Sequence, residues 1–268
     1  MRGLITILCL IALNACSTWK YVSSKHQNAE ELGLAGHPRK VITYRYQQDG
    51  RLFIKSTDSF NADGYRTQKQ LEIHNPGKPV RYDTSYWIFD QNNFLTSELL
   101  NNQKTGYVNN RHGRVKKKYF YRHPDSLALL TTYKYKPRHR KIILKSYNTD
   151  GSLYSTGISS YDKQDHIIYS KFFIPGYNAL EETWWERDEQ GRKILSKLKS
   201  NDINDTLYTY FRYDPYGKLS STRYVDQDKK IKIKKFTYRL DSLGNWIERT
   251  QEVNGYKIKE RKEIEYYK

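Results

Sequence analysis

Apolar and polar residues alternate along most of the chain after residue 40. In the stretch Ile231-Lys232-Ile233-Lys234, apolar residues alternate with basic ones, and near the C-terminus Ile258, Ile264 and Tyr266 share one parity. A period of two is typical of β-strands that bury one face and expose the other. Helical periodicity is scarce. The pattern therefore predicts an all-β chain whose wet positions are filled mostly by Lys, Arg, Glu and Thr.

One predicted strand contains an irregularity. Phe236, Tyr238 and Leu240 lie on the opposite parity from Ile233, the last apolar residue of the preceding alternation. A slip of one residue in the backbone register would return all of these side chains to one face. The sequence therefore predicts a β-bulge near Lys234-Lys235.

A short motif recurs between the predicted strands: Asp or Asn, two free residues, and Gly. In the clearest copy, Asp214-Pro215-Tyr216-Gly217, Asp can accept a backbone N–H, Pro presets φ, and Gly supplies a positive φ. These residues predict a type I turn followed by a bulge, which joins antiparallel strands. Other copies are Asp188 with Gly191, Asp241 with Gly244, Asn148 with Gly151, Asn61 with Gly64, and Asn110 with Gly113. Weaker variants are Gln47 with Gly50, Asp90 with Asn93, and Asp162 with Asp165.

The spacing of the motif suggests a repeat. Gly191, Gly217 and Gly244 follow one another at intervals of 26 and 27 residues, which fits one hairpin plus one return connection. Tyr-Asp-x-x-Gly units at this spacing resemble YD (RHS-type) repeats. The stretches 31–34 and 244–249 resemble the opening and closing units of uncharacterised Bacteroidota-type repeat lipoproteins. The resemblance covers about residues 31–268. It implies repeated antiparallel β-hairpins that form an extended, rolled or stacked sheet, and it implies no activity.

The N-terminus has the three parts of a secretory signal. Met1-Arg2 is basic, Gly3 to Leu13 is almost wholly apolar, and Leu13-Asn14-Ala15-Cys16 resembles a lipobox. An apolar run of this length is too short to span a bilayer, which needs about 20 residues. We expect cleavage between Ala15 and Cys16 and lipidation of Cys16. The predicted organisation is a signal peptide at 1–15, a lipidated tether at 16–38 and a β-hairpin repeat domain at 39–268.

The residues after Cys16 bear on the destination of the protein. Ser17-Thr18-Trp19-Lys20 contains no acid, and known lipoprotein sorting patterns then imply an outer-membrane anchor that faces the periplasm. Cys9 is removed with the signal, so the mature chain keeps one cysteine, the acylated one. A disulfide within the chain and thiol catalysis are both excluded.

The chain is strongly basic, with a formal net charge of +18. Such a charge attracts polyanions, and in the periplasm these are lipid head groups, lipopolysaccharide phosphates and acidic glycans. Nucleic acid is not expected as a partner there. The alternative explanation is that the basic residues simply fill the wet face of the sheet.

Residues for catalysis or metal binding are sparse. The seven histidines lack metal-ligand spacing, and neither a nucleophile elbow nor a phosphate-binding loop is present. We therefore expect no enzyme activity and no cofactor. Glu182 with Glu186, near Trp184-Trp185, is the most enzyme-like cluster, and its alternative explanation is a solvated strand. Glu181 and Glu182 are adjacent and should point to opposite faces.

Tyrosine is abundant, with 25 copies, and most of them follow the alternation of half-buried strands. Trp184 and Trp185 are consecutive, so one should face outward, and this makes the pair the predicted binding surface. Three Asp-Ser/Thr-Leu stretches resemble the acceptor for periplasmic O-glycosylation in Bacteroidota-type bacteria. Their hydroxyl residues are Ser126, Thr206 and Ser242.

Three functions remain open at this point. The first is a non-catalytic envelope lipoprotein whose basic, Tyr-rich sheet binds or scaffolds an anionic glycan or lipopolysaccharide. The second is a protein-partner role, as an immunity or antitoxin-like factor or as an accessory subunit of an outer-membrane complex. The third is a glycan-degrading enzyme that uses Glu182 and Glu186.

Overall fold

A computed structural model describes residues 28–267, apart from 31, 102, 124–125, 202–205 and 226–229. Ala15 and Cys16 lie outside these described residues. Within them the regular secondary structure is β-strand, apart from two short 3-10 turns, η2 (Pro137–His139) and η3 (Pro175–Tyr177). The prediction of an all-β chain is therefore confirmed.

Eighteen strands follow one another in the part of the chain that the structure describes. They are β1 (Pro38–Tyr46), β2 (Leu52–Phe60), β3 (Arg66–Ile73), β4 (Arg81–Phe89), β5 (Leu95–Leu100), β6 (Gln103–Asn109), β7 (Val115–His123), β8 (Ser126–Lys136), β9 (Lys141–Tyr147), β10 (Leu153–Tyr161), β11 (Ile167–Ile174), β12 (Ala179–Arg187), β13 (Lys193–Ser200), β14 (Leu207–Tyr213), β15 (Leu219–Val225), β16 (Ile231–Leu240), β17 (Trp246–Val253) and β18 (Tyr256–Tyr266).

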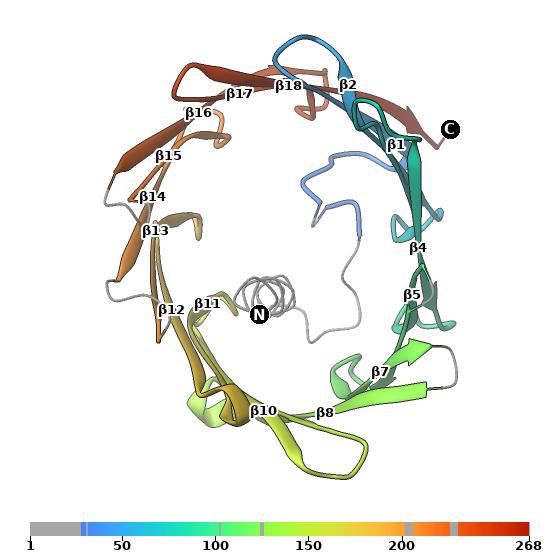
Figure 1. The fold of residues 1–268 in the computed structure, drawn as a ribbon, viewed down its shortest axis with the longest axis vertical. Helices are drawn as coiled ribbons and strands as arrows, with labels where there is room; N and C mark the ends of the chain where they lie inside the picture. Colours follow the sequence, from blue (N-terminus) through green and yellow to red (C-terminus); the bar gives the residue numbers. More distant parts are fainter. Residues whose placement is uncertain are drawn as a thin grey trace.

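Each strand pairs antiparallel with its neighbours in sequence, and β18 pairs with β1. The ring is therefore closed (Figure 1). The prediction of an extended, rolled or stacked sheet was wrong, because the last strand meets the first and leaves no open edge. Closure satisfies the backbone groups that an open edge would expose. A barrel of this strand number is too wide for its wall side chains to fill.

The register determines which side chains face the interior. Residues 28–30 and 32–37 lie inside the ring (Figure 1), and Ala29 and Leu34 pack there on Val41 of β1 and Phe60 of β2. Val41 and Phe60 therefore face inward. Residues opposite one another on paired strands share a face. The pairings therefore identify the inward-facing residues of every strand in the wall. A second buried cluster around Val115 lies on the same inner face.

The repeat turns gather at one rim. Strands alternate in direction, so every second connection lies at the same end of the barrel. Seven Asp- or Asn-initiated turns share one rim, which we call the repeat rim; they begin at Asn61, Asp90, Asn110, Asp162, Asp188, Asp214 and Asp241. The copies at Gln47 and Asn148 lie at the opposite rim. An interval of 26 or 27 residues thus equals two strands and two turns, as the spacing predicted.

The turn at Asp214 follows the predicted chemistry. The Gly217 N–H donates to the Asp214 carbonyl at 3.0 Å, and Gly217 has a φ of +77°. The Asp214 carboxylate accepts the backbone N–H groups of Tyr216 and Lys218 at 2.9 and 2.8 Å. A register shift follows, where Tyr213 pairs with Leu219. The turn therefore ends in a bulge that redirects the next strand.

Tyrosine hydroxyls join successive hairpins on the inner face. The Tyr213 hydroxyl donates to the Lys193 carbonyl at 2.9 Å, and the Tyr238 hydroxyl donates to the Leu219 carbonyl at 2.9 Å. Both acceptors are the bulge residues that follow a repeat turn. Each bond links two adjacent strands that belong to successive repeat hairpins, and it contributes on the order of 1 kcal/mol. This geometry gives Tyr in the repeat a structural role.

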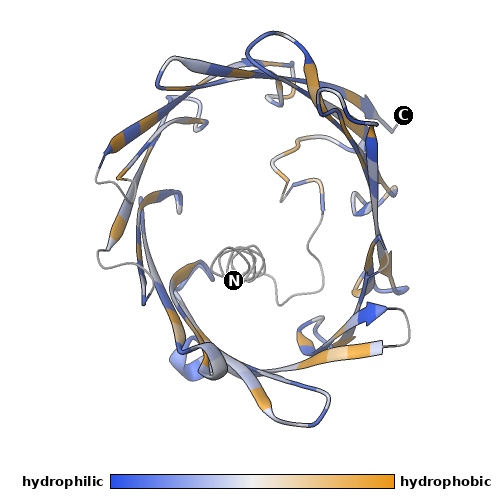
Figure 2. Cartoon of the chain, viewed as in Figure 1, coloured by the Kyte–Doolittle hydropathy of each residue, from blue (hydrophilic) through white to orange (hydrophobic). Residues whose placement is uncertain are grey.

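The predicted bulge near Lys234-Lys235 was wrong. β16 keeps an unshifted register with both neighbours at these residues. Ile231 and Ile233 instead face outward and are 53% and 43% exposed, while Phe236 continues the inward face. The apolar residues change face here, and the backbone does not slip. Figure 2 shows that apolar and polar residues are interspersed around the whole wall.

Two repeat glycines provide a matched test of packing at the turns. Gly113 and Gly151 both have positive φ, +72° and +82°. A Cβ on Gly113 would lie 2.4 Å from the Phe94 ring, whereas one on Gly151 would meet nothing within 4 Å. We expect Gly151→Ala to cost about 1–2 kcal/mol of unfolding free energy from backbone strain alone. Gly113→Ala should cost about 1–3 kcal/mol more from overpacking. Urea unfolding measures both, and equal costs would contradict the role of Phe94.

Candidate functional site at the repeat rim

The turn between β16 and β17 holds the N-terminal segment against the inside of the repeat rim. The Asn245 side chain accepts the Ala35 N–H at 2.6 Å and donates to the Ala35 carbonyl at 3.1 Å. Asn245 is 1% exposed, and its Nδ2 also donates to the Tyr266 hydroxyl at 2.8 Å. That hydroxyl donates to Asp241 at 2.9 Å. A buried amide thus replaces a strand partner for residue 35.

Two further contacts anchor the same segment. The Ala29 N–H donates to the Gly64 carbonyl at 2.8 Å in the turn between β2 and β3. The Tyr267 N–H donates to the His37 carbonyl at 2.9 Å. Residues 28–37, which the sequence assigned to a tether, therefore pack along the inner side of the rim.

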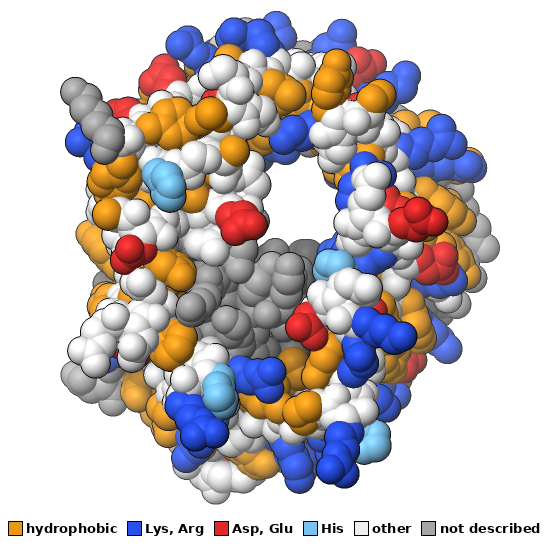
Figure 3. Space-filling model, turned by 180° about the vertical axis from the view of Figure 1, so that it is seen from behind, with side chains coloured by type: hydrophobic (Ala, Val, Ile, Leu, Met, Phe, Trp, Pro, Cys, Tyr) orange, Lys and Arg blue, Asp and Glu red, His pale blue; other side chains and the backbone are white. Residues whose placement is uncertain are grey.

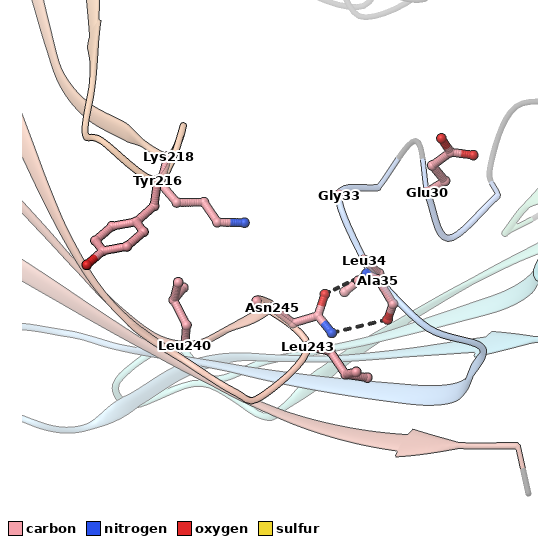
Figure 4. Close-up of a pocket in the computed structure, with 10 residues that line it drawn as sticks. Glu30, Gly33, Leu34, Ala35, Tyr216, Lys218, Leu240, Leu243 and Asn245 are labelled. Carbon is pink, nitrogen blue, oxygen red and sulfur yellow. Dashed lines mark hydrogen bonds between the residues drawn. The ribbon is translucent and has the colours of Figure 1, made fainter.

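A pocket of about 480 Å³ opens between this segment and two repeat turns (Figure 4). Its lining residues are Glu30, Gly33, Leu34, Ala35, Tyr216, Lys218, Leu240, Leu243, Gly244 and Asn245. We call it the rim pocket. Tyr216 is 81% exposed, and the side chains of Tyr216 and Lys218 leave the same turn in different directions (Figure 4). Among the described residues, Lys218 forms no ion pair. The pocket therefore combines an exposed aromatic ring, a cation without an ion pair and the carboxylate of Glu30.

A cluster of charged side chains lies on the inner wall next to this pocket. Arg45 of β1 and Arg249 of β17 both bind Glu260 of β18, whose side chain is only 5% exposed. Two guanidinium groups therefore share one buried carboxylate.

Lys262 of β18 adds a further cation to the cluster. Its ammonium lies 3.6 Å from the centre of the Trp246 ring, and no carboxylate of a described residue lies within ion-pair distance of it. Burial, together with the nearby charge of Arg249, lowers the pKa of Lys262 to about 8, against the opposing effects of Glu260 and Asp58. Burial similarly lowers the pKa of Lys69 on β3.

The rim pocket and the inner-wall cluster are continuous. Leu240, which lines the pocket, pairs across β16 and β17 with Trp246. The charge of Lys218 also acts on Lys262 and contributes to lowering the Lys262 pKa. The two features together form one region where cations outnumber acids, and this arrangement attracts anions.

The structure separates the two tryptophans of the predicted binding surface. Trp184 faces outward and packs against Tyr169, with ring centroids 5.4 Å apart. Trp185 faces inward beneath Lys193, whose ammonium lies 5.4 Å from the ring centre. Their alternation follows the strand geometry, so the pair does not form one surface, and neither residue lines the rim pocket.

The glutamates of β12 do not form a catalytic pair. Glu182 accepts from the Tyr169 hydroxyl at 2.7 Å, and Glu186 binds Lys197 at 2.7 Å. Four residues along a strand place them about 13 Å apart, which exceeds the separation that glycosidase carboxylates need. Glu181 faces inward and forms no ion pair among the described residues, and burial raises its pKa to about 7.

The remaining sequence-predicted positions lie elsewhere. Ser126 begins β8 and Ser242 lies in the turn after β16, both exposed, while Thr206 is half-buried before β14. Within the described residues, no group of three His, Cys, Asp or Glu side chains could hold a metal ion. None of the described helices is long and apolar enough to cross a membrane.

Sequence reasoning missed Lys218, Asn245, Glu260 and Lys262. A signal was present for the last two, because they share the parity of Ile258 and Ile264. Charged residues within an otherwise apolar face indicate a buried polar cluster or a binding site.

Comparison with known proteins adds remote likenesses to this closed, up-and-down antiparallel β-barrel. No family model matches the chain, and no curated protein matches it. A porin-like protein from Bacteroides uniformis is 13% identical over 85% of this chain and 98% of its own, with a TM-score of 0.48. One from Bacteroides vulgatus is 13% identical over 87% and 99%, with a TM-score of 0.40. The Photorhabdus luminescens Tc holotoxin pore is 11% identical over 76% and 12%, with a TM-score of 0.34.

The unneutralised Lys262 has a consequence for stability. Its folded-state pKa of about 8 lies below its ordinary value of 10.5, so the charged form opposes folding below pH 8. Between pH 8 and pH 10.5 the unfolded chain binds more protons, and stability should rise with pH. We expect Lys262→Met to raise the unfolding free energy at pH 7 by up to about 3 kcal/mol.

Urea unfolding at pH 7 and pH 9.5 tests this expectation. The gap between Lys262→Met and the parent should narrow at the higher pH. Lys259→Met, on the outer face of the same strand, is the matched control and should show no such gap. A gap that does not change with pH would contradict the titration of Lys262.

Proposed function

We propose that this chain is a non-catalytic lipoprotein of the cell envelope that binds a short segment of an anionic glycan at the rim pocket. The observation that carries the proposal is the combination of Tyr216 and Lys218 in one open pocket next to Lys262. An exposed aromatic ring can stack on the apolar face of a sugar. The two ammonium groups supply charge for a carboxylate, sulfate or phosphate substituent.

The volume of the pocket suits a ligand of one or two sugar units. Small-molecule sites occupy about 300–1,000 Å³, and the rim pocket has about 480 Å³. Binding an anion would also offset the cost of holding Lys262 charged and half-buried. A residue that weakens folding and strengthens ligand binding is expected at a functional site.

The outer wall supports a barrel that stands in water and is held to a membrane through Cys16. Outward positions on β17 and β18 carry Glu248, Lys259 and Arg261. Each Lys or Arg at the middle of a bilayer would cost roughly 2–4 kcal/mol. The same wall carries charges on most of its strands, so insertion of the barrel into lipid would be strongly unfavourable. The anchor would then supply the membrane attachment.

Removing the anchor tests this arrangement. A chain that begins at Ser17, behind a secretory signal without a lipobox, should appear in the soluble periplasmic fraction without detergent. The native chain should remain with the outer membrane. Recovery of the anchorless, folded chain in the membrane fraction would indicate that the barrel itself is embedded, because no acyl chain would hold it there.

Binding to a defined glycan tests the site. We expect the protein to bind oligogalacturonate at low salt and to ignore neutral dextran, because the recognition is electrostatic. Lys218→Met and Tyr216→Ser should each weaken binding by about tenfold, which corresponds to roughly 1.4 kcal/mol. Isothermal titration calorimetry measures both effects.

Two matched controls accompany these variants. Lys259→Met makes the same change of net charge on the outer wall, and Tyr177→Ser removes a 61% exposed tyrosine at the opposite rim. Both should bind like the parent. If all four variants bind alike, the rim pocket is not the glycan site.

A further inference from the structure

The outer wall distributes its charge unevenly, and on one arc of it acids offset part of the positive charge. On β16, β17, β18 and β1, together at the top of Figure 1, cations pair with acids of the same or the adjacent strand. The pairs are Arg39 with Glu265 at 2.9 Å, Arg239 with Glu248 at 2.6 Å, Arg261 with Glu263 at 3.3 Å, and Lys257 with Glu252 at 3.7 Å. The four acids therefore offset more than half of the positive charge on this arc, although Lys235 and Lys259 form no ion pair among the described residues.

The arc on the opposite side of the ring carries cations without acids. It comprises the outward residues of β7, β8 and β9 and the turn between β8 and β9, and we call it the basic arc. Its cations, all exposed, are Lys117, Lys134, Lys136, Arg138, Arg140, Lys141 and Lys145. Among the described residues, none of them forms an ion pair. Basic side chains without acidic ones gather along the lower edge of Figure 3, where these strands lie.

Two acids near the basic arc accept hydrogen bonds within their own turns. In the turn after β9, Asp150 accepts the Ser152 N–H and hydroxyl at 2.8 and 2.6 Å. In the turn after β10, Asp162 accepts the His166 N–H at 2.9 Å and lies 3.2 Å from the His166 ring. Both carboxylates bind groups of their own turns, and neither forms an ion pair with a cation of the basic arc.

We propose that the basic arc docks the barrel sideways against the phosphate head groups of an anionic lipid bilayer. Charge complementarity favours this occupant, because each Lys or Arg near an anionic membrane surface adds to the attraction. The two spacings between the three strands spread these cations over a width of roughly 10 Å. The cations therefore form a flat face and not a pocket. Lysine is depleted from protein–protein interfaces, so a protein partner fits this composition less well.

Apolar residues interleave with the lysines and suit the same surface. Lys134 pairs with Ile143, and Ile143 pairs with Ile158 of β10 across the sheet. Ile158 is 37% exposed. Shallow contact of such residues with the head-group region adds to electrostatic attraction without insertion of the barrel. This docking surface is separate from the rim pocket and does not depend on the proposed glycan site.

Lysine labelling on vesicles tests the orientation. The full-length protein is mixed with phosphatidylglycerol or phosphatidylcholine vesicles, and acetylation rates are read by mass spectrometry. We expect Lys134, Lys136, Lys141 and Lys145 to react at least fivefold more slowly on phosphatidylglycerol. Lys257 and Lys259, on the opposite arc of the ring, should react equally on both. Equal rates at the basic arc, or protection of both arcs alike, would overturn the proposal.

Substitution gives an independent measurement. Replacing Lys134, Lys136, Lys141 and Lys145 together by Gln should weaken cosedimentation with phosphatidylglycerol vesicles at least tenfold, and high salt should mimic this loss. The matched control replaces Lys40, Lys235, Lys257 and Lys259 by Gln and removes the same net charge. If the two quadruple variants lose equal affinity, net charge alone drives the attraction and the docking surface is refuted.

The acetylation assay also distinguishes other ligands of the basic arc from lipid. Soluble oligogalacturonate that protects the basic arc as strongly as phosphatidylglycerol does would make it a glycan surface and overturn docking to lipid. The Lys218→Met variant should dock normally, so failure of the glycan site and failure of this surface can be told apart.

Discussion

The antiparallel pairing of β1 with β18 runs from Pro38 opposite Tyr266 to Tyr46 opposite Lys259. This contact joins residues more than two hundred positions apart, and it turns a series of hairpins into a ring. Without it, β1 and β18 would each expose a row of unpaired backbone groups. Closure also gives the wall an inside and an outside. The alternating side chains of every strand therefore point in turn to the interior of the ring and to its exterior.

The inner-wall cluster exists because of that seam. Glu260 on β18 lies between Arg249 on β17 and Arg45 on β1, so its environment depends on both ends of the chain. Lys262 lies two residues further along β18 and shares this environment without a carboxylate of its own. The excess of cations that makes the region suitable for an anion is thus created by ring closure.

The repeat turns contribute differently. Each one is locally determined by Asp or Asn at its first position, yet their shared rim follows from the strict alternation of strand direction. The turn at 241–245 is the one whose Asn245 reaches residue 35, and the turn at 214–217 supplies Tyr216 to the same pocket. Neighbouring repeats, with the same backbone geometry, therefore perform different tasks through the residues at their free positions.

Local sequence patterns specify that the chain is built of strands, where the turns at Asp188, Asp214 and Asp241 lie, and that Trp184 and Trp185 point to opposite faces. These features depend on local φ preferences and on the two-residue period of a strand. The sequence did not determine closure, nor which parity faces inward, as Ile231 and Ile233 demonstrate by facing water. The sequence also did not predict the rim pocket or the basic arc. Only the tertiary structure decided these, because they depend on pairings between strands that are distant in the chain and on the curvature that closure imposes.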